Sequence, residues 1–181
     1  MHHYCLFCLT QRTEIIKRLV ECAWGYKVIS PTNVQRHWEH GQKVEKEVRF
    51  LPGYLFIYSE EPIGYFAPLR QINGVIRQLG TLESGFELNG PDLAFSELLL
   101  QNKGKIGTQK VYKEGDRIRL CEGLLKGFSG TITKVDHQYK RMQITFTFDG
   151  VERKVWTGYD IVAKPENGDG NEETKQTVLS D

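Results

Sequence analysis

A short polar segment divides the chain and limits how it can fold. From residue 101 to residue 110 the sequence is Lys, Gly, Thr, Gln and Asn, with Ile106 as the one apolar residue. Such a segment has too little apolar surface to contribute to a packed core, which is typical of a solvated linker. We therefore predict two domains, at residues 1–100 and 113–164, joined by a basic flexible linker at residues 101–112.

The first 100 residues alternate between strand and helix patterns. Apolar residues at helical spacing predict a helix over residues 13–24, which Gly25 would end. Two further helices are predicted, over residues 62–72 and 91–100. The other apolar runs predict strands over residues 4–9, 26–30, 54–58 and 74–79, and a charged hairpin arm over residues 38–49. This order indicates an α+β fold in which helices pack on an antiparallel sheet.

The second domain has the pattern of a small β-barrel. Short strands are predicted over residues 116–121, 130–135, 142–148 and 152–156, separated by turn residues. The Asp149-Gly150 pair between two of these strands is a strong hairpin signal. Residues 165–181 carry five acidic residues and one lysine among mostly polar side chains, so we predict a disordered acidic tail.

Several classes of protein are disfavoured by the sequence. Cys5 and Cys8 have a CxxC spacing, but in a strand they would point to opposite faces, so we expect buried thiols and no metal site. No run of about 18 apolar residues occurs, and the N-terminus lacks signal-peptide features, so we expect a cytoplasmic protein without a membrane contact. No catalytic triad, carboxylate pair or phosphate-binding glycine loop is recognisable, which predicts no enzyme and no cofactor.

The charge is unevenly distributed along the chain. The net charge is +1, but residues 1–100 carry 10 basic and 11 acidic side chains, whereas residues 113–164 carry 10 basic and 7 acidic ones. The linker adds three lysines and no acid. A basic linker and barrel suit a nucleic-acid partner, but a solvated mixed-charge surface gives the same counts.

Two segments carry a resemblance to a known family. Residues 115–136, with Gly130 between a turn and an alternating strand, resemble a KOW motif. Glycine is expected there because a Cβ would obstruct a close backbone approach or a positive φ. The run FLPGYLFI at residues 50–57 resembles the signature of the NusG N-terminal domain, and residues 4–7 and 72–76 resemble two of its strands. Together they identify the chain as similar to NusG-family elongation factors, which implies an SH3-like KOW barrel after the α+β domain.

The resemblance implies that the N-terminal domain docks on the clamp of RNA polymerase. The residues at the matching positions, our predicted polymerase contacts, are Cys8, Leu51, Tyr54 and Phe56. Tyr54 and Phe56 share a face by strand alternation, so an aromatic docking patch is geometrically feasible. The alternative is that they fill the core beneath the helices.

The barrel departs from the housekeeping pattern of the family. Residues 148–156 read FDGVERKVW, where a proline-containing apolar strand is usual, and basic residues interleave there with aromatic ones. Basic side chains neutralise phosphates and aromatic faces stack unpaired bases. The predicted RNA contacts are Lys134, Tyr139, Lys140, Arg141, Arg153, Lys154 and Trp156.

Among specialised members, the resemblance is closest to LoaP-like antiterminators. It implies a monomer that binds polymerase and a nascent RNA hairpin, with single-stranded non-template DNA as a further partner to test. The alternatives are a housekeeping-type factor, an RfaH-like factor recruited by DNA, or a ribosome-associated KOW protein. The sequence leaves open the RNA target, the regulated operons, pausing against antitermination, and the role of the arm at residues 38–49.

Overall fold

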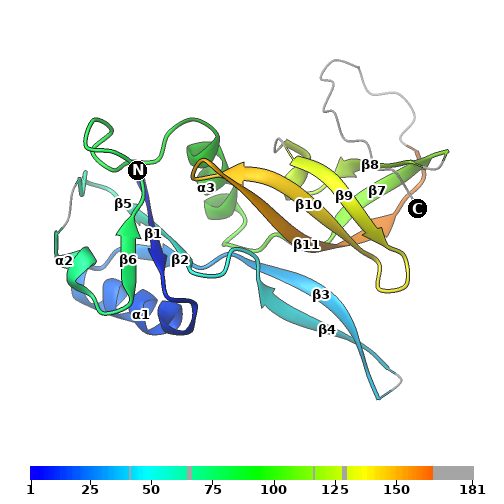
Figure 1. Ribbon diagram of the computed structural model, residues 1–181, viewed down its shortest axis with the longest axis horizontal. Coiled ribbons are helices and arrows are strands. Elements are labelled where there is room, and N and C mark those ends of the chain that lie inside the picture. Colours follow the sequence, from blue (N-terminus) through cyan, green and yellow to red (C-terminus); the bar gives the residue numbers. More distant parts are fainter. Residues whose placement is uncertain (41, 65–66, 116, 128–129, 165–181) are drawn as a thin grey trace. The chain divides into compact units, whose positions relative to one another are not determined.

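The computed structural model describes residues 1–40, 42–64, 67–115, 117–127 and 130–164 (Figure 1). The chain forms two compact units. Unit 1 contains Met1–Pro31 and Leu51–Lys105, and unit 2 contains Thr32–Phe50 and the described residues from Ile106 onward. The hairpin arm is therefore grouped with the barrel, although the sequence suggested one uninterrupted domain over residues 1–100. The predicted tail, residues 165–181, lies outside the described residues.

Unit 1 contains a four-stranded sheet in the order β2-β5-β1-β6. Its strands are β1 (His2–Cys8), β2 (Lys27–Ile29), β5 (Tyr54–Ser59) and β6 (Val75–Gln78), and each neighbouring pair is antiparallel. The alternation of β1 and β5 gives the sheet two apolar faces. Tyr4 and Leu6 lie opposite Ile57 and Leu55 on one face. This confirms the expected α+β architecture.

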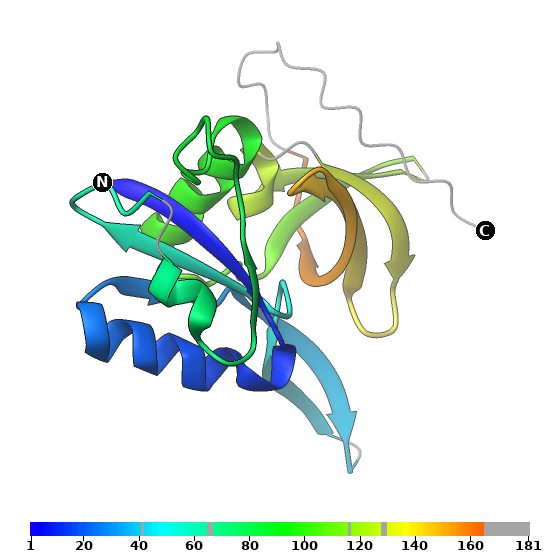
Figure 2. The same cartoon turned by 60° about the vertical axis from the view of Figure 1, so that its left-hand side comes forward.

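Helices cover both faces of this sheet (Figure 2). Helix α1 (Thr13–Trp24) buries Ile16 and Val20 in the same core cluster as Leu55 and Ile57. It ends as predicted at Gly25, which has a φ of 70° and donates its N–H to the Glu21 carbonyl at 3.0 Å. Helix α2 (Ala67–Gln71) is shorter than the predicted helix over residues 62–72, of which residues 65–66 are not described.

Helix α3 (Gly90–Gln101) packs on the other face of the sheet, where its Phe95 and Leu99 are fully buried. The Tyr58 hydroxyl donates to the Ser96 carbonyl at 3.0 Å, and the His3 ring nitrogen Nδ1 lies 2.9 Å from Ser96 Oγ. Desolvation on burial lowers the pKa of His3, which favours the neutral ring at this position. The predicted helix over residues 91–100 is thus confirmed.

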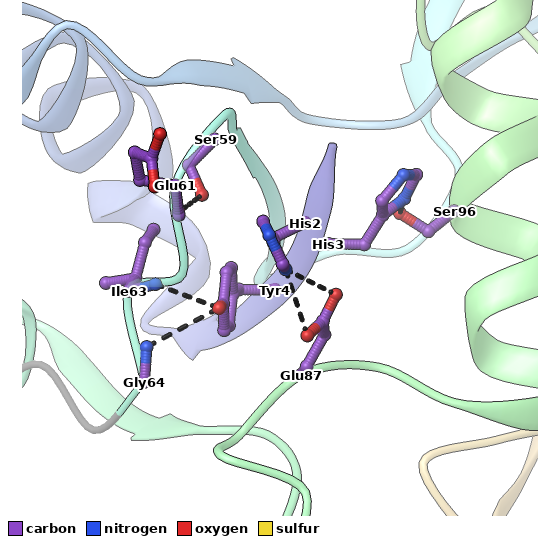
Figure 3. A network of polar contacts seen from close by, with 9 residues as sticks. All are labelled: His2, His3, Tyr4, Ser59, Glu61, Ile63, Gly64, Glu87 and Ser96. Carbon is purple, nitrogen blue, oxygen red and sulfur yellow. Dashed lines mark hydrogen bonds and ion pairs between the residues drawn. The ribbon is translucent and has the colours of Figure 1, made fainter.

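Polar contacts near the start of β1 hold the surrounding loops in place (Figure 3). The Tyr4 hydroxyl accepts the backbone N–H groups of Ile63 and Gly64 at 2.9 and 3.4 Å. The His2 ring lies 3.0 Å from a carboxylate oxygen of Glu87, in the segment that leads to α3. The Tyr4 hydroxyl thus satisfies loop backbone groups that the sheet itself does not reach, and the His2–Glu87 pair ties the segment before α3 to β1.

Unit 2 contains a curved five-stranded sheet in the order β8-β7-β11-β10-β9. Its strands are β7 (Gln109–Glu114), β8 (Arg117–Glu122), β9 (Gly130–Asp136), β10 (Arg141–Phe148) and β11 (Val151–Ile161). A short 3-10 helix, η2 (Leu124–Gly127), follows β8. Four of these strands match predicted ones, although β11 is longer than predicted. The inward side chains Met142, Ile144, Phe146 and Phe148 are buried and form the core of the barrel.

The predicted linker over residues 101–112 is wrong at both ends. Gln101 is the last residue of α3, and β7 begins at Gln109. Gln109 and Val111 are fully buried. The Gln109 amide donates to the Ile106 and Gly107 carbonyls, both at 3.0 Å, and accepts the Leu125 N–H at 3.1 Å. The polar side chain of Gln109 can be buried here because its amide group is fully hydrogen-bonded.

The predicted arm is a two-stranded hairpin of β3 (Thr32–Glu39) and β4 (Gln42–Arg49). Its base is attached to β11. The Asn33 and Gln35 side-chain amides both donate to the Trp156 carbonyl, at 2.8 and 3.2 Å. The Arg36 guanidinium reaches the Asp160 carboxylate at 2.9 Å, and hydrogen bonding to that carboxylate raises the pKa of Arg36. At its base the hairpin is therefore part of unit 2 rather than a projecting arm.

Unit 2 contains the two glycines that the sequence singled out, and the turn at Gly150 is confirmed. Asp149 and Gly150 have φ values of 57° and 67°, the pair of positive angles that a tight hairpin turn requires. Gly130 has no positive φ, but a Cβ placed there would lie 2.8 Å from Ile144 Cγ2. The nearest backbone atom, the Thr145 carbonyl oxygen, would be 3.5 Å from that Cβ, so it is the Ile144 side chain rather than a close backbone approach that leaves no room here.

Candidate nucleic-acid interface

The outer face of β9, β10 and β11 brings together most of the predicted RNA contacts. Because alternate residues of β10 point into the barrel, Arg141, Gln143 and Thr145 point outward. Gln143 lies opposite Lys134 of β9 and opposite Trp156 of β11, so these three residues form one row across the sheet. Lys154 lies opposite Thr145 in the next row.

Arg141 lies at the centre of a cluster on this face. Its guanidinium carbon is 5.0 Å from the centroid of the Tyr139 ring and 4.8 Å from that of the Trp156 ring. Its Nε donates to Asp136 Oδ2 at 3.0 Å, and the Tyr139 N–H donates to Asp136 Oδ1 at 3.1 Å. We call Asp136, Tyr139, Arg141 and Trp156 the Arg141 cluster. Two aromatic faces and one carboxylate fix the orientation of this guanidinium.

Asp136 is held in its charged form. Burial alone would raise the pKa of Asp136, but the Tyr139 N–H and the Arg141 guanidinium stabilise the carboxylate, and the net effect is a lowered pKa. The carboxylate is thus ionised throughout the neutral range and anchors Arg141. Sequence reasoning missed Asp136 and Gln143. The turn between β9 and β10 was predicted and could have revealed Asp136, because it brings residues 136 and 141 opposite each other.

Two lysines, Lys134 and Lys154, share the outer face with the Arg141 cluster, and a third, Lys140, lies in the turn between β9 and β10. Lys134 and Lys140 are exposed, and neither has a carboxylate partner among the described residues. Lys154 Nζ is 3.4 Å from Glu152 Oε1, but both side chains are more than half exposed, so this pair contributes little. Arg141, Lys134 and Lys154 on this face, with Lys140 in the adjoining turn, outnumber the carboxylates of Asp136 and Glu152, so the excess charge is positive.

Arg153 does not belong to this face. It lies opposite Phe146, whose side chain is in the core of the barrel, whereas its neighbour Lys154 points outward. Adjacent residues of a strand point to opposite faces, so Arg153 does not share the outer face with Lys154, and its RNA contact stays a prediction.

The four predicted polymerase contacts are buried. Cys8, Leu51, Tyr54 and Phe56 have exposed fractions of 1%, 3%, 2% and 0%, so they form no exposed patch in this structure. The Tyr54 ring packs 4.8 Å from that of Phe7, and the Phe56 ring packs edge-on against Phe95 of α3 at 5.8 Å.

Cys8 also lies on a different face from the two aromatic residues. It belongs to the core cluster of Tyr4 and Leu6, whereas Cys5 lies opposite Phe56, as the predicted opposite orientation of the two thiols requires. Burial raises the pKa of the Cys8 thiol to about 12, so Cys8 is a protonated apolar side chain at neutral pH.

No described helix is long and apolar enough to cross a membrane.

Comparison with known proteins assigns the family. Residues 1–91 match the family described as transcription termination factor nusG. The transcription termination/antitermination protein NusG of Thermus thermophilus is 26% identical over 151 residues, covering 77% of this chain and 80% of the relative. The protein of the same name from Haemophilus influenzae is 25% identical over 145 residues, covering 78% and 77%.

The fold has a counterpart among solved structures. A structure described as domain interaction in Thermotoga maritima NusG matches with a TM-score of 0.52 at 18% identity, over 87% of this chain and 93% of that one. At this identity the match shows the fold, namely an α+β domain followed by a small β-barrel. The family match over residues 1–91 spans half of this chain. The chain therefore belongs to the NusG family of transcription termination and antitermination factors.

Proposed function

We propose that this chain is a specialised antitermination factor that binds RNA polymerase through unit 1 and a structured leader RNA through its barrel. The Arg141 cluster carries the proposal, because it combines an oriented cation, two aromatic rings and nearby lysines on one face. No chemical step is involved. Binding the nascent hairpin while attached to polymerase raises the effective concentration of that RNA and makes recruitment operon-specific.

The composition of the face supports RNA rather than a protein partner. Lys134, Lys140 and Lys154 can each neutralise a phosphate, and flexible exposed lysines suit a backbone whose position varies. Tyr139 and Trp156 are half-buried, so each has ring surface left for contact. Single-stranded loops and bulges expose bases that stack on such rings.

The Lys134→Ala, Lys140→Ala double variant is expected to flatten the salt dependence of RNA binding. Each lost phosphate contact removes about 0.7–0.9 from the slope of log K against log salt concentration, so the slope should become shallower by roughly 1.5. The measurement is a gel-shift titration of the leader RNA of this gene's own operon at several salt concentrations.

Lys113→Ala, Lys126→Ala is the matched control for that titration. Both residues are exposed in unit 2 but lie in β7 and η2, away from the outer face of β9–β11. Their loss should leave the slope nearly unchanged. Equal slopes for the two double variants would refute the assignment, and weak binding that ignores RNA sequence would favour a housekeeping or DNA-recruited factor instead. A single-stranded DNA competitor with the sequence of the leader RNA then distinguishes a DNA-recruited factor from a housekeeping one.

The polymerase contact is proposed at β5, by the resemblance of residues 50–57. Tyr54 is buried, so contact there requires the side chains over it, Phe7 among them, to move on binding. Tyr54→Leu is expected to weaken retention of nuclease-treated polymerase by about 2 kcal/mol, the size of an interface hot spot. Tyr58→Leu, an equally buried tyrosine of the same strand, is the control. Equal losses, scaled to each variant's thermal stability, would contradict docking at Tyr54.

A further inference from the structure

We infer that Arg141 reads an unpaired guanine within the bound RNA. This inference rests on the proposed RNA-binding function and names the base recognised at the same face. It makes Arg141 the residue that determines sequence preference, while the lysines around it supply affinity for any RNA.

The arginine is oriented so that its outer edge is available. Nε is the nitrogen that contacts Asp136, and no other acceptor for Arg141 occurs among the described residues. The two terminal nitrogens therefore have donors to offer. The side chain is 30% exposed, so a ligand can reach it. Because Tyr139 and Trp156 already hold the guanidinium, little side-chain entropy remains to be lost on binding.

The charge of the cluster favours a base over a phosphate. Asp136 compensates the charge of Arg141 and is itself held in the ionised form, so the cluster is close to neutral and its carboxylate repels an approaching phosphate. Two uncharged hydrogen-bond acceptors on the edge of a base are not repelled by the Asp136 carboxylate in this way. Two parallel donors on one guanidinium match O6 and N7 of guanine, whereas adenine presents a donor and an acceptor on that edge.

The guanine must be unpaired. The major groove of an A-form helix is too deep and narrow for a side chain to reach base edges, so a guanine inside a regular stem is inaccessible. In a loop or bulge, by contrast, the base can lie in the plane of the guanidinium. Its neighbours then stack on Tyr139 or Trp156, and their phosphates lie near Lys134 on the same face and Lys140 in the adjoining turn.

The test uses the full chain and short oligouridines that carry one central guanine, adenine or 7-deazaguanine. In fluorescence anisotropy the guanine oligomer should bind about 5- to 150-fold more tightly than the adenine one, the range of a good bidentate contact. In 7-deazaguanine a carbon takes the place of N7, so this oligomer should lose much of the affinity advantage of guanine over adenine. Arg141→Lys keeps the charge but not the two parallel donors, so it should bind all three oligomers alike.

Asp136→Asn is the second variant, and it separates base reading from charge. Without the carboxylate, Arg141 is less fixed and less compensated. We expect tighter binding to plain oligouridine, a steeper salt slope and a smaller preference for guanine. The matching experiment on the leader RNA changes each unpaired guanine to adenine, and at least one change should weaken binding to the native chain but not to Arg141→Lys.

The outcomes distinguish failure of guanine recognition by Arg141 from failure of the proposed RNA binding. Native protein that binds all oligomers alike and tolerates every guanine change in the leader overturns guanine reading and leaves RNA binding intact. A guanine preference that survives in Arg141→Lys, with unchanged thermal stability, also overturns it. Failure to bind the leader RNA at all overturns the proposed function itself.

Discussion

Replacing Phe56 with alanine is expected to lower the free energy of unfolding of unit 1 by about 3–5 kcal/mol. Phe56 is fully buried, and its ring packs edge-on against Phe95 of α3 at 5.8 Å. Truncation removes the buried ring and leaves a cavity between the sheet and α3. This loss is a large part of the roughly 5–15 kcal/mol that holds a small domain folded. Urea unfolding followed by circular dichroism measures it.

Leu82→Ala is the control for this substitution, because Leu82 is 81% exposed and its loss should change stability by less than about 0.5 kcal/mol. The comparison also decides between the two roles that the sequence allowed for Phe56. A cost near that of Leu82→Ala would mean that Phe56 contributes little to the core, and would favour a docking role instead.

Replacing Trp156 with alanine is expected to weaken leader-RNA binding by about 1–3 kcal/mol, the contribution of one stacked base. The variant keeps the Trp156 carbonyl that accepts Asn33 and Gln35, so the hairpin remains attached to β11. It loses a stacking surface and one of the two rings that orient Arg141. Competition titration against unlabelled leader RNA gives the change in affinity.

Tyr112→Ala tests whether any aromatic residue of the barrel has the same effect. Tyr112 is half-buried in β7, and Lys164 lies over its ring at 6.0 Å, so it also pairs an aromatic face with a cation. It is outside the face formed by β9–β11, and its loss should leave RNA affinity unchanged. If both variants weaken binding equally, the RNA contact is not specific to the Arg141 cluster.

Local patterns in the sequence predicted those elements that local interactions determine. Helix α1 has the predicted bounds because its apolar spacing and the Gly25 stop act within a few turns. The Asp149-Gly150 turn was predicted for the same reason. Strand β7 was missed because its pairing with β8 and β11 is non-local, and because Gln109 satisfies its buried amide through partners as distant as Leu125.

The candidate site was predicted in composition but not in arrangement. The sequence identified Arg141, Tyr139 and Trp156, yet the cluster depends on strand register, which places Asp136 beside Arg141 and turns Arg153 inward. The polymerase contacts illustrate a second limit. Alternation correctly gave Tyr54 and Phe56 a common face, but a strand buried on both sides has no polar face to show which residues are exposed.

The attachment of the hairpin to β11 has a consequence for how the chain folds during synthesis. Residues 32–50 leave the ribosome long before Asp160, the partner of Arg36, has been made. At about 5–20 residues per second, the hairpin waits roughly 5–20 s for that partner. During this interval Asn33, Gln35 and Arg36 must find temporary solvent or chain contacts. Unit 2 is therefore expected to complete its fold only after translation of β11, later than the helices and strands of unit 1 form.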